Sequence, residues 1–233
     1  MEQQLSELLR PTELADLIQP LELIQRLERM VERRTLVNML FHGKSGLGKT
    51  SAARIILKKL DTFAYRVNGS METGINFVRD HLEDFCVNPS LDLRLKVCFI
   101  DECDYLSPNA QAGLRGLIEK TDVPFIMTAN DITKFDRALK SRCMPVNFDV
   151  GPLQATEVIK TLLPQYQEKL ARFGYYIDDE WLWRLMCVSF PDLRSVANQI
   201  EFEYGPPSEE RADLFQMEQD GGAGKSGNGK KAP

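Results

Sequence analysis

The residues best suited to chemistry form one glycine-rich segment, Gly-Lys-Ser-Gly-Leu-Gly-Lys-Thr, at positions 43–50. Glycines at these spacings let successive backbone N–H groups turn toward a polyphosphate, while Lys49 can reach the terminal phosphates. The hydroxyl of Thr50 can ligate Mg²⁺ at the start of a helix, where the helix dipole favours anions. This segment, called here the phosphate loop, predicts binding of a nucleoside triphosphate together with Mg²⁺.

A second group of candidate residues follows two apolar runs, 97–100 and 125–128. Asp101 can bind the Mg²⁺ and Glu102 can polarise an attacking water, because neighbouring positions at a strand end point to opposite sides. Asn130 can position the same water through its amide, since ligands lie beyond the carboxyl ends of parallel strands. The alternatives are an acidic turn and a turn-forming asparagine. Combined with the phosphate loop, these residues indicate hydrolysis.

Alternating strands and helices would bring these residues together. Amphipathic patterns predict helices at 21–34 and 75–85, and strands separated by helices predict a parallel sheet that is covered on both faces. From residue 151 the pattern is helical only, at 155–173, 179–188 and 193–203, which predicts a small helical lid. The expected strands lie at 36–41, 63–67, 96–100, 125–128 and 144–148.

The expected organisation is a nucleotide-binding domain over 1–150, a lid over 151–204 and a polar, disordered tail over 205–233. The net charge is −5, so any contact with nucleic acid has to come from a local basic face. The five cysteines show neither metal-type nor disulfide-type spacing. No apolar run approaches the roughly 20 residues that span a bilayer, and the first residues do not form a signal peptide. We therefore expect an intracellular, cytoplasmic protein.

These motifs resemble those of the AAA+ ATPases, and among them the clamp-loader small subunits of the replication factor C and phage group. Asp-Glu-Cys-Asp at 101–104 is similar to the DExD box. Residues 110–119 resemble the helix written AQxALRRxxE, with Gly113 and Gly116 at two substituted positions. The resemblance covers about residues 8–204. It implies an α/β fold, with a P-loop αβα parallel-sheet domain followed by a helical lid. It also implies a Mg²⁺-dependent ATPase of DNA replication, in a bacterial or phage-type setting.

Two arginines gain catalytic roles from this resemblance. Ser-Arg-Cys at 141–143 is similar to the SRC motif, so Arg142 would act in the nucleotide site of a neighbouring subunit. A guanidinium suits this task because it can neutralise charge that develops on the transferred phosphoryl group. Arg194, in a segment similar to sensor 2 with Pro191 where glycine is common, would touch the γ-phosphate from the lid. A solvated surface arginine is the alternative for both. The predicted catalytic residues are Lys49, Glu102, Asn130, Arg142 and Arg194.

The resemblance also implies contacts with DNA and with the nucleotide. Residues 74–79 are similar to the GIDxVR segment, with Asn76 at its acidic position. Arg79 and Arg115 are the candidate DNA contacts, and a solvated helix residue is the alternative for Arg79. The N-terminal residues 10–18 resemble the RPxxLxDlv segment that packs around adenine. The predicted nucleotide contacts are Arg10, Pro11, Gly43, Lys44, Ser45, Gly46, Leu47, Gly48, Lys49, Thr50 and Ser51.

The implied partners are other AAA+ subunits, DNA and a sliding clamp, with no membrane. Members of the family carry a further helical collar domain that holds the ring of subunits together, whereas this sequence ends in the polar tail. A minimal or phage-type subunit that borrows a collar from a partner is therefore expected. The alternatives are a nucleotide-gated recruitment ATPase of the helicase-loader or transposition-regulator type, and a subunit that binds ATP with little turnover.

Overall fold

The computed structural model describes residues 4–71, 74–89 and 92–207. A five-stranded sheet with the order β2-β3-β4-β1-β5 forms its centre, and every neighbouring pair of strands is parallel. All five predicted strands are present, with ends shifted by no more than three residues. The strands are β1 (Met39–His42), β2 (Phe63–Asn68), β3 (Lys96–Asp101), β4 (Phe125–Ala129) and β5 (Met144–Asn147).

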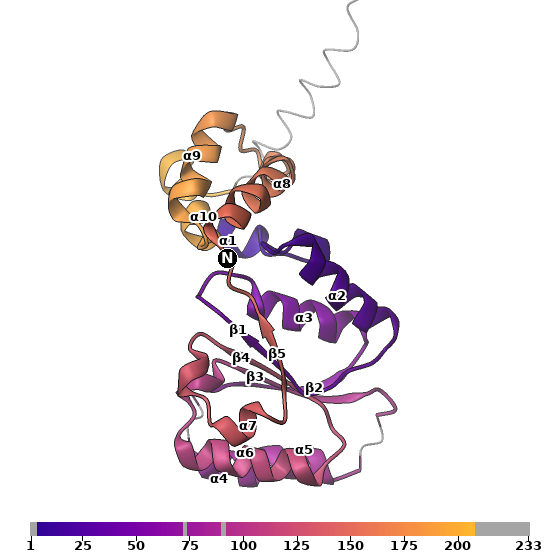
Figure 1. Cartoon of the computed structure of the whole chain (residues 1–233). Helices are drawn as coiled ribbons and strands as arrows, with labels where there is room; N and C mark the ends of the chain where they lie inside the picture. Colours follow the sequence, from indigo (N-terminus) through magenta and orange to yellow (C-terminus); the bar gives the residue numbers. More distant parts are fainter. Residues whose placement is uncertain (1–3, 72–73, 90–91, 208–233) are drawn as a thin grey trace, which may run out of the picture. The chain divides into compact units, whose positions relative to one another are not determined.

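Helices cover both faces of this sheet, with α2 and α3 on one face and α4 to α7 on the other (Figure 1). This arrangement lets a parallel sheet bury both faces, and it confirms the predicted fold class. Short 3₁₀ turns at Leu14–Asp16, Cys103–Tyr105 and Ile132–Lys134 connect the elements. The helices are α2 (Leu21–Glu32), α3 (Lys49–Lys59), α4 (Ile75–Phe77), α5 (Glu83–Val87), α6 (Pro108–Lys120) and α7 (Arg137–Lys140).

Local sequence explains where several of these helices begin and how they continue. Ser107 caps α6 by accepting a hydrogen bond from the N–H of Ala110, and Pro108 occupies the first turn. The helix continues through Gly113 and Gly116 because Leu114 and Leu117 anchor it in the core. The helix predicted at 75–85 is interrupted, since a π-helical turn (Val78–Leu82) separates α4 from α5.

The three central strands, β1, β3 and β4, form the buried core of the sheet and set the positions of the predicted site residues. Phe41 lies opposite Thr128, and Ile100 lies opposite Met127, so the carboxyl ends of these strands are level. The N–H of Gly43 donates to the carbonyl of Ala129 at 3.3 Å, which continues the β1–β4 pairing into the phosphate loop. The phosphate loop, the acidic pair and Asn130 therefore emerge at one edge.

Contacts divide the chain into two compact units, Pro11–Val158 and a second unit formed by Met1–Arg10 with Ile159–Pro233. This division falls inside α8 (Pro152–Ala171), later in the chain than the boundary predicted at residue 150. The second unit also includes α1 (Leu5–Leu8), which the sequence did not assign to the lid. The predicted tail lies outside the described residues from position 208 onward.

The second unit is helical, as predicted for the lid. Its remaining helices are α9 (Asp179–Ser189) and α10 (Leu193–Tyr204). Leu5 is completely buried, and its N–H donates to the Glu201 carboxylate at 3.2 Å, which ties α1 to α10. The hydroxyl of Tyr166 on α8 donates to the Leu193 carbonyl at 3.3 Å. The apolar core consists of Ile159, Leu162, Leu170, Leu182, Met186, Val196 and Ile200.

Candidate nucleotide site

The phosphate loop joins the end of β1 to the start of α3. Gly48, the residue before α3, has φ of 81°, a left-handed conformation that favours glycine. A Cβ at this position would lie 3.3 Å from the side chain of Leu17. Lys44, Ser45 and Gly46 are exposed along the loop, which leaves its crest open to a ligand. The following helix gives this crest a positive dipole end, so the geometry suits an anion.

Lys49 supplies a buried cation beneath the loop. Its side chain is largely buried, with the residue 6% exposed, and its Nζ donates to the carbonyls of Gly43 at 2.6 Å and Lys44 at 2.7 Å. Burial lowers the pKa of Lys49 because it disfavours the charged form, while the nearby carboxylates oppose this effect. No carboxylate forms an ion pair with Nζ among the described residues. The site therefore holds a cation that has backbone partners and room to attract an anion.

Asp101, at the end of β3, brings together oxygen atoms from three elements. Its Oδ1 accepts hydrogen bonds from the Thr50 hydroxyl at 2.8 Å and from the Thr128 hydroxyl at 2.5 Å. Carboxylate and hydroxyl oxygens are ligands that suit Mg²⁺, which usually keeps several waters and takes few protein groups. The residues present therefore fit the implied metal, and Thr50 and Asp101 are the groups that could hold it.

Glu102 is turned away from the direction of the strand. Its backbone adopts φ of 55°, and its N–H donates to the Thr128 hydroxyl at 2.9 Å. Thr128 thus donates to Asp101 and accepts from Glu102, so a single side chain fixes both acidic residues. The Glu102 side chain is half-buried, and its carboxylate forms no hydrogen bond or ion pair within the described part of the chain. This leaves its carboxylate available to a water molecule.

Asp104 and Asn130 lie beside this acidic pair. Asp104 is buried at 7% exposure and accepts hydrogen bonds from the N–H groups of Asn130 at 3.2 Å and Asp131 at 3.3 Å. These bonds fix the backbone of Asn130, while its side chain is exposed. Cys103 donates from Sγ to the Thr128 carbonyl at 2.8 Å, and burial raises the pKa of its thiol well above the usual range. The cysteine is a structural contact in this turn.

The segment before α2 packs directly on the phosphate loop. Gln19 is buried, and its Nε2 donates to the carbonyls of Leu47 at 3.0 Å and Phe148 at 3.1 Å. One amide therefore links this segment, the loop and the residue that follows β5. Leu14 and Leu17 are buried in the same segment. Leu17 and Gln19 thus lie beside the loop, and the adenine contact implied for residues 10–18 stays a prediction.

Three residues that the sequence reasoning did not identify shape this site. Thr128 links the acidic pair, and Asp149 accepts a hydrogen bond from the N–H of Lys44 at 2.8 Å. A Cβ at Gly43 would lie 2.9 Å from the Asp149 carboxylate, so these two residues are in close contact. A Cβ at Gly69 would lie 2.8 Å from the Glu102 carbonyl. The sequence does offer a signal for Thr128, because it is a hydroxyl residue on the strand next to the acidic pair. No neighbouring sequence pattern indicates Asp149.

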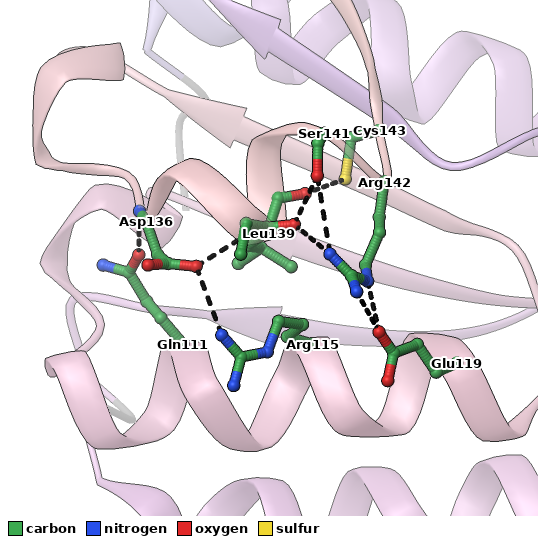
Figure 2. A network of polar contacts seen from close by, with 9 residues as sticks. Gln111, Arg115, Glu119, Asp136, Leu139, Ser141, Arg142 and Cys143 are labelled. Atoms are coloured by element: carbon green, nitrogen blue, oxygen red, sulfur yellow. Dashed lines mark hydrogen bonds and ion pairs between the residues drawn. The ribbon is translucent and has the colours of Figure 1, made fainter.

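Arg142 lies on a different surface, between α7 and β5. Figure 2 shows its guanidinium directed toward α6, where Nε and Nη2 contact the Glu119 carboxylate. Nη1 donates to the Ala138 carbonyl at 2.6 Å. The Arg142 side chain is 34% exposed and that of Glu119 is 49% exposed, so water screens this pair. Within its own subunit, Arg142 has a carboxylate partner.

Arg115 belongs to a neighbouring part of the same surface (Figure 2). Its Nη1 lies 3.9 Å from Oδ1 of Asp136, which caps α7 by accepting from the Leu139 N–H at 2.9 Å. The buried side chain of Gln111 accepts from the Asp136 N–H at 2.7 Å. These contacts fix α7 against α6. Arg115 is 40% exposed, so it remains accessible.

The other predicted arginines are described by their local surroundings. Arg194 is exposed in the first turn of α10, where Asp192 accepts its N–H at 3.1 Å. Arg10 pairs with Glu7 at 2.9 Å within the second unit. The side chain of Arg79 lies outside what the structure describes. The roles predicted for these arginines stay predictions.

Comparisons with known proteins show which proteins this chain is similar to. Residues 39–150 match the family described as ATPase family associated with various cellular activities (AAA). A replication factor C small subunit from Thermoplasma acidophilum is 32% identical over 207 residues, covering 85% of this chain and 63% of that protein. The corresponding protein of Methanococcus maripaludis strain S2 is 34% identical, covering 82% of this chain and 62% of its own length. The chain therefore belongs to the AAA+ ATPase family. Within that family it groups with replication factor C small subunits, as the motifs predicted.

Solved structures support the fold. The RuvB Holliday junction branch migration motor of Thermotoga maritima has a TM-score of 0.62 and 20% identity. The alignment covers 91% of this chain and 73% of that one. The chain spans less than two thirds of the length of the curated relatives described above. Every helix in the described ranges is too short or too polar to cross a bilayer.

Proposed function

We propose that the chain is an ATP-hydrolysing AAA+ subunit that acts in DNA replication. The contact that supports this most directly joins Thr50 to Asp101 beside the buried Lys49. A hydroxyl, a carboxylate and a cation from two adjacent elements match the needs of a metal-bound triphosphate. Thr50 and Asp101 would hold Mg²⁺, which would supply positive charge to neutralise the negative charge of the phosphates.

Hydrolysis requires a base and a positioned water. Glu102 is suited to accept a proton because its carboxylate is free while its backbone is fixed by Thr128. The Asn130 side chain, held at the adjacent strand end, would orient the water. Lys49 would donate to the β- and γ-phosphates, exchanging carbonyl contacts for phosphate oxygens. This division of labour separates binding by Lys49 from proton transfer by Glu102.

We assign Arg142 to the nucleotide site of a neighbouring subunit. It lies beside α7 and contacts Glu119, whereas the phosphate loop follows β1. In such a site its guanidinium would neutralise charge on the transferred phosphoryl group. Arg194 would report the nucleotide state from the lid by touching the γ-phosphate. An isolated subunit is therefore expected to hydrolyse ATP slowly.

The proposed partners are other AAA+ subunits, DNA and a sliding clamp. The relationship to replication factor C small subunits supports this proposal. Arg115 is 40% exposed and is the described candidate for a DNA phosphate contact. Stimulation of hydrolysis by primer-template DNA only when a clamp is added would support clamp loading. Equal stimulation by DNA alone would instead support the recruitment ATPase.

Mixing of inactive subunits tests the catalytic assignment. Glu102→Gln should retain ATP binding and lower hydrolysis by at least about 100-fold, because the base is lost. Arg142→Ala should also be inactive, although its own phosphate loop is intact. A mixture of the two should recover activity, since Glu102→Gln subunits supply Arg142 to intact sites. Arg137→Ala, an exposed arginine on α7, is the matched control and should remain active.

The same variants also provide the outcome that contradicts the proposal. Masses measured in solution with a non-hydrolysable ATP analogue, with and without DNA, would show whether subunits associate under the assay conditions. Full activity of a monomeric Arg142→Ala protein would exclude action in a neighbouring site. Undiminished hydrolysis by Glu102→Gln would exclude Glu102 as the base.

A further inference from the structure

A groove on the first unit is unrelated to the phosphate loop. It has a volume of about 330 Å³ and lies between one face of α2 and the start of β5. Val37, two residues before β1, and Met144, the first residue of β5, line it. The phosphate loop follows the opposite end of β1. The four residues of that strand, about 13 Å, thus separate the groove from the nucleotide site.

The groove combines an apolar floor with a basic rim. Val37 and Met144 are 45% and 39% exposed, and Leu23 of α2 also lines the surface. The rim consists of Arg26, Arg29 and Arg33, whose spacing places them along one face of α2. No acidic residue lines the groove.

These three arginines differ in their partners from the arginines that form ion pairs elsewhere in the described residues. Arg115, Arg142, Arg172 and Arg184 each have a carboxylate partner. The guanidinium groups of Arg26, Arg29 and Arg33 have no hydrogen bond or ion pair to any residue in 4–71, 74–89 and 92–207. The chain carries a net charge of −5, so this basic rim is a local feature. An unpaired cluster beside exposed apolar side chains suits a negatively charged partner with apolar residues.

The edge of β5 limits how such a partner can bind. The N–H of Met144 donates to the Asn38 carbonyl, so the next backbone nitrogen, that of Pro145, faces the free edge. Proline has no N–H and cannot donate to an added strand. The missing donor at the groove end of β5 disfavours an added strand there and favours a partner that binds through side chains, as an amphipathic helix does in an apolar groove. The lining includes no aromatic residue on which the bases of a single-stranded nucleic acid could stack.

We propose that this groove binds an acidic amphipathic helix of a partner protein. Apolar side chains one turn apart would cover Leu23, Val37 and Met144. Flanking carboxylates would pair with Arg26, Arg29 and Arg33, where each arginine can bind a carboxylate through two N–H groups. The groove and the phosphate loop lie at opposite ends of β1, so we expect the partner to bind with or without ATP.

A labelled peptide provides a direct test. The probe is a fluorescein-labelled, helix-stapled peptide with two leucines four residues apart and flanking glutamates, and the readout is fluorescence anisotropy with the full chain. A matched peptide with lysines in place of the glutamates is the probe control. The acidic peptide should bind at least tenfold more tightly than the lysine peptide, and its affinity should fall as salt rises.

Protein variants locate the binding surface. Arg29→Glu should weaken binding of the acidic peptide at least tenfold, and Met144→Ser should weaken it several-fold. Arg54→Glu, an exposed arginine on α3 outside the groove, is the matched control and should bind as the original chain does. Thermal melting and ATP binding would show that each variant is folded.

Three results would overturn the proposal. These are no saturable binding of the acidic peptide, equal binding to the Arg29→Glu variant, and displacement of the peptide from the original chain by a single-stranded oligonucleotide with higher affinity. The last result would assign the groove to nucleic acid. Undiminished hydrolysis by Glu102→Gln would contradict the nucleotide assignment without changing any of these three outcomes, so failure of that assignment is distinguishable from failure of this proposal.

Discussion

Lys49 and Arg142 are the two cations most closely tied to the proposed catalysis, and the structure holds them in opposite ways. Lys49 is buried, and its ammonium group contacts two backbone carbonyls of the phosphate loop. Arg142 is partly exposed, and its guanidinium contacts the carboxylate of Glu119. The first cation is fixed by the backbone of its own loop. The second is held by a side chain that water can replace.

Lys49 is therefore a permanent cation of its site. Arg142 is a conditional one, because its position depends on the exposed contact with Glu119. The two carbonyls that Lys49 contacts belong to the phosphate loop itself, so its ammonium group already lies at the loop before any nucleotide arrives. The pair of Arg142 and Glu119 is worth between about 0 and 1 kcal/mol, as expected for exposed ion pairs. A neighbouring phosphate can therefore attract Arg142 at small cost. The first region is the phosphate loop with Lys49 and the acidic pair, and variants there should have large effects. The second region is the contact of Arg142 with Glu119, and variants that change how Arg142 is held, rather than Arg142 itself, should have small effects.

The largest effect is expected for Lys49→Ala. Removal of the buried ammonium should weaken ATP binding at least about 100-fold, because a charge-assisted contact between a buried side chain and phosphate is lost. Isothermal titration with ATP and Mg²⁺ measures this. Lys58→Ala, which removes an exposed lysine of the same helix, is the control and should bind ATP normally. Equal ATP affinities of the Lys49→Ala and Lys58→Ala variants would contradict the role of Lys49 as the permanent cation of the site.

A smaller effect on the same region is expected for Thr128→Val. Valine keeps the shape and removes the hydroxyl that links Asp101 to the N–H of Glu102. The free energy of unfolding should fall by about 1–3 kcal/mol, because polar groups lose their partner. Hydrolysis should fall about tenfold as the two acidic residues lose their alignment. Thr128→Ser restores the hydroxyl and should recover most of both losses, and failure to do so would indicate that the methyl group matters instead.

The strand pattern and the glycine spacing predicted most of the first region. Asp101 and Thr50 meet as expected, because a parallel sheet places the ends of β1 and β3 at one edge. Thr128 was missed since its role depends on the register between β3 and β4, which one sequence does not encode locally. Asp149 was missed for a similar reason. It follows β5, and only the three-dimensional pairing of β1 with β5 places it beside Gly43.

The second region shows what motif spacing leaves out. The resemblance to an SRC motif identified Arg142, but it gave no information about Glu119, which is 23 residues earlier in the chain. The assignment of α1 to the second unit was also missed, because Leu5 and Leu9 form too short an apolar pattern to indicate a partner. Contacts between segments far apart in sequence depend on packing that periodicity does not reveal.

A third prediction separates charge from hydrogen bonding at Asp149. Asp149→Asn keeps an oxygen that can accept from the Lys44 N–H and removes a negative charge near the phosphates, so ATP affinity should equal or exceed that of the original chain. Asp149→Ala loses the acceptor as well and should weaken ATP binding several-fold through a less ordered loop. The Michaelis constant should change more than the turnover rate in both variants. Tighter binding by Asp149→Ala than by Asp149→Asn would contradict this role.

The smallest effect is expected for Glu119→Gln, and it tests the conditional nature of the second region. The free energy of unfolding should change by less than about 1 kcal/mol, because the lost ion pair is exposed. The Arg142 guanidinium would no longer be held by a carboxylate, so association of ATP-bound subunits should tighten by up to about fivefold. Sedimentation at low and high salt measures this, and the difference between variant and original chain should shrink as salt rises.

Lys120→Gln changes the neighbouring residue of α6 and is the control for Glu119→Gln. The side chain of Lys120 is 68% exposed and forms its ion pair with Glu83, not with the Arg142–Glu119 pair. Its replacement should leave association unchanged. If Glu119→Gln instead lowered stability by several kcal/mol, Glu119 would be a fixed part of the fold. Arg142 would then resemble Lys49, and the distinction between a permanent and a conditional cation would fail.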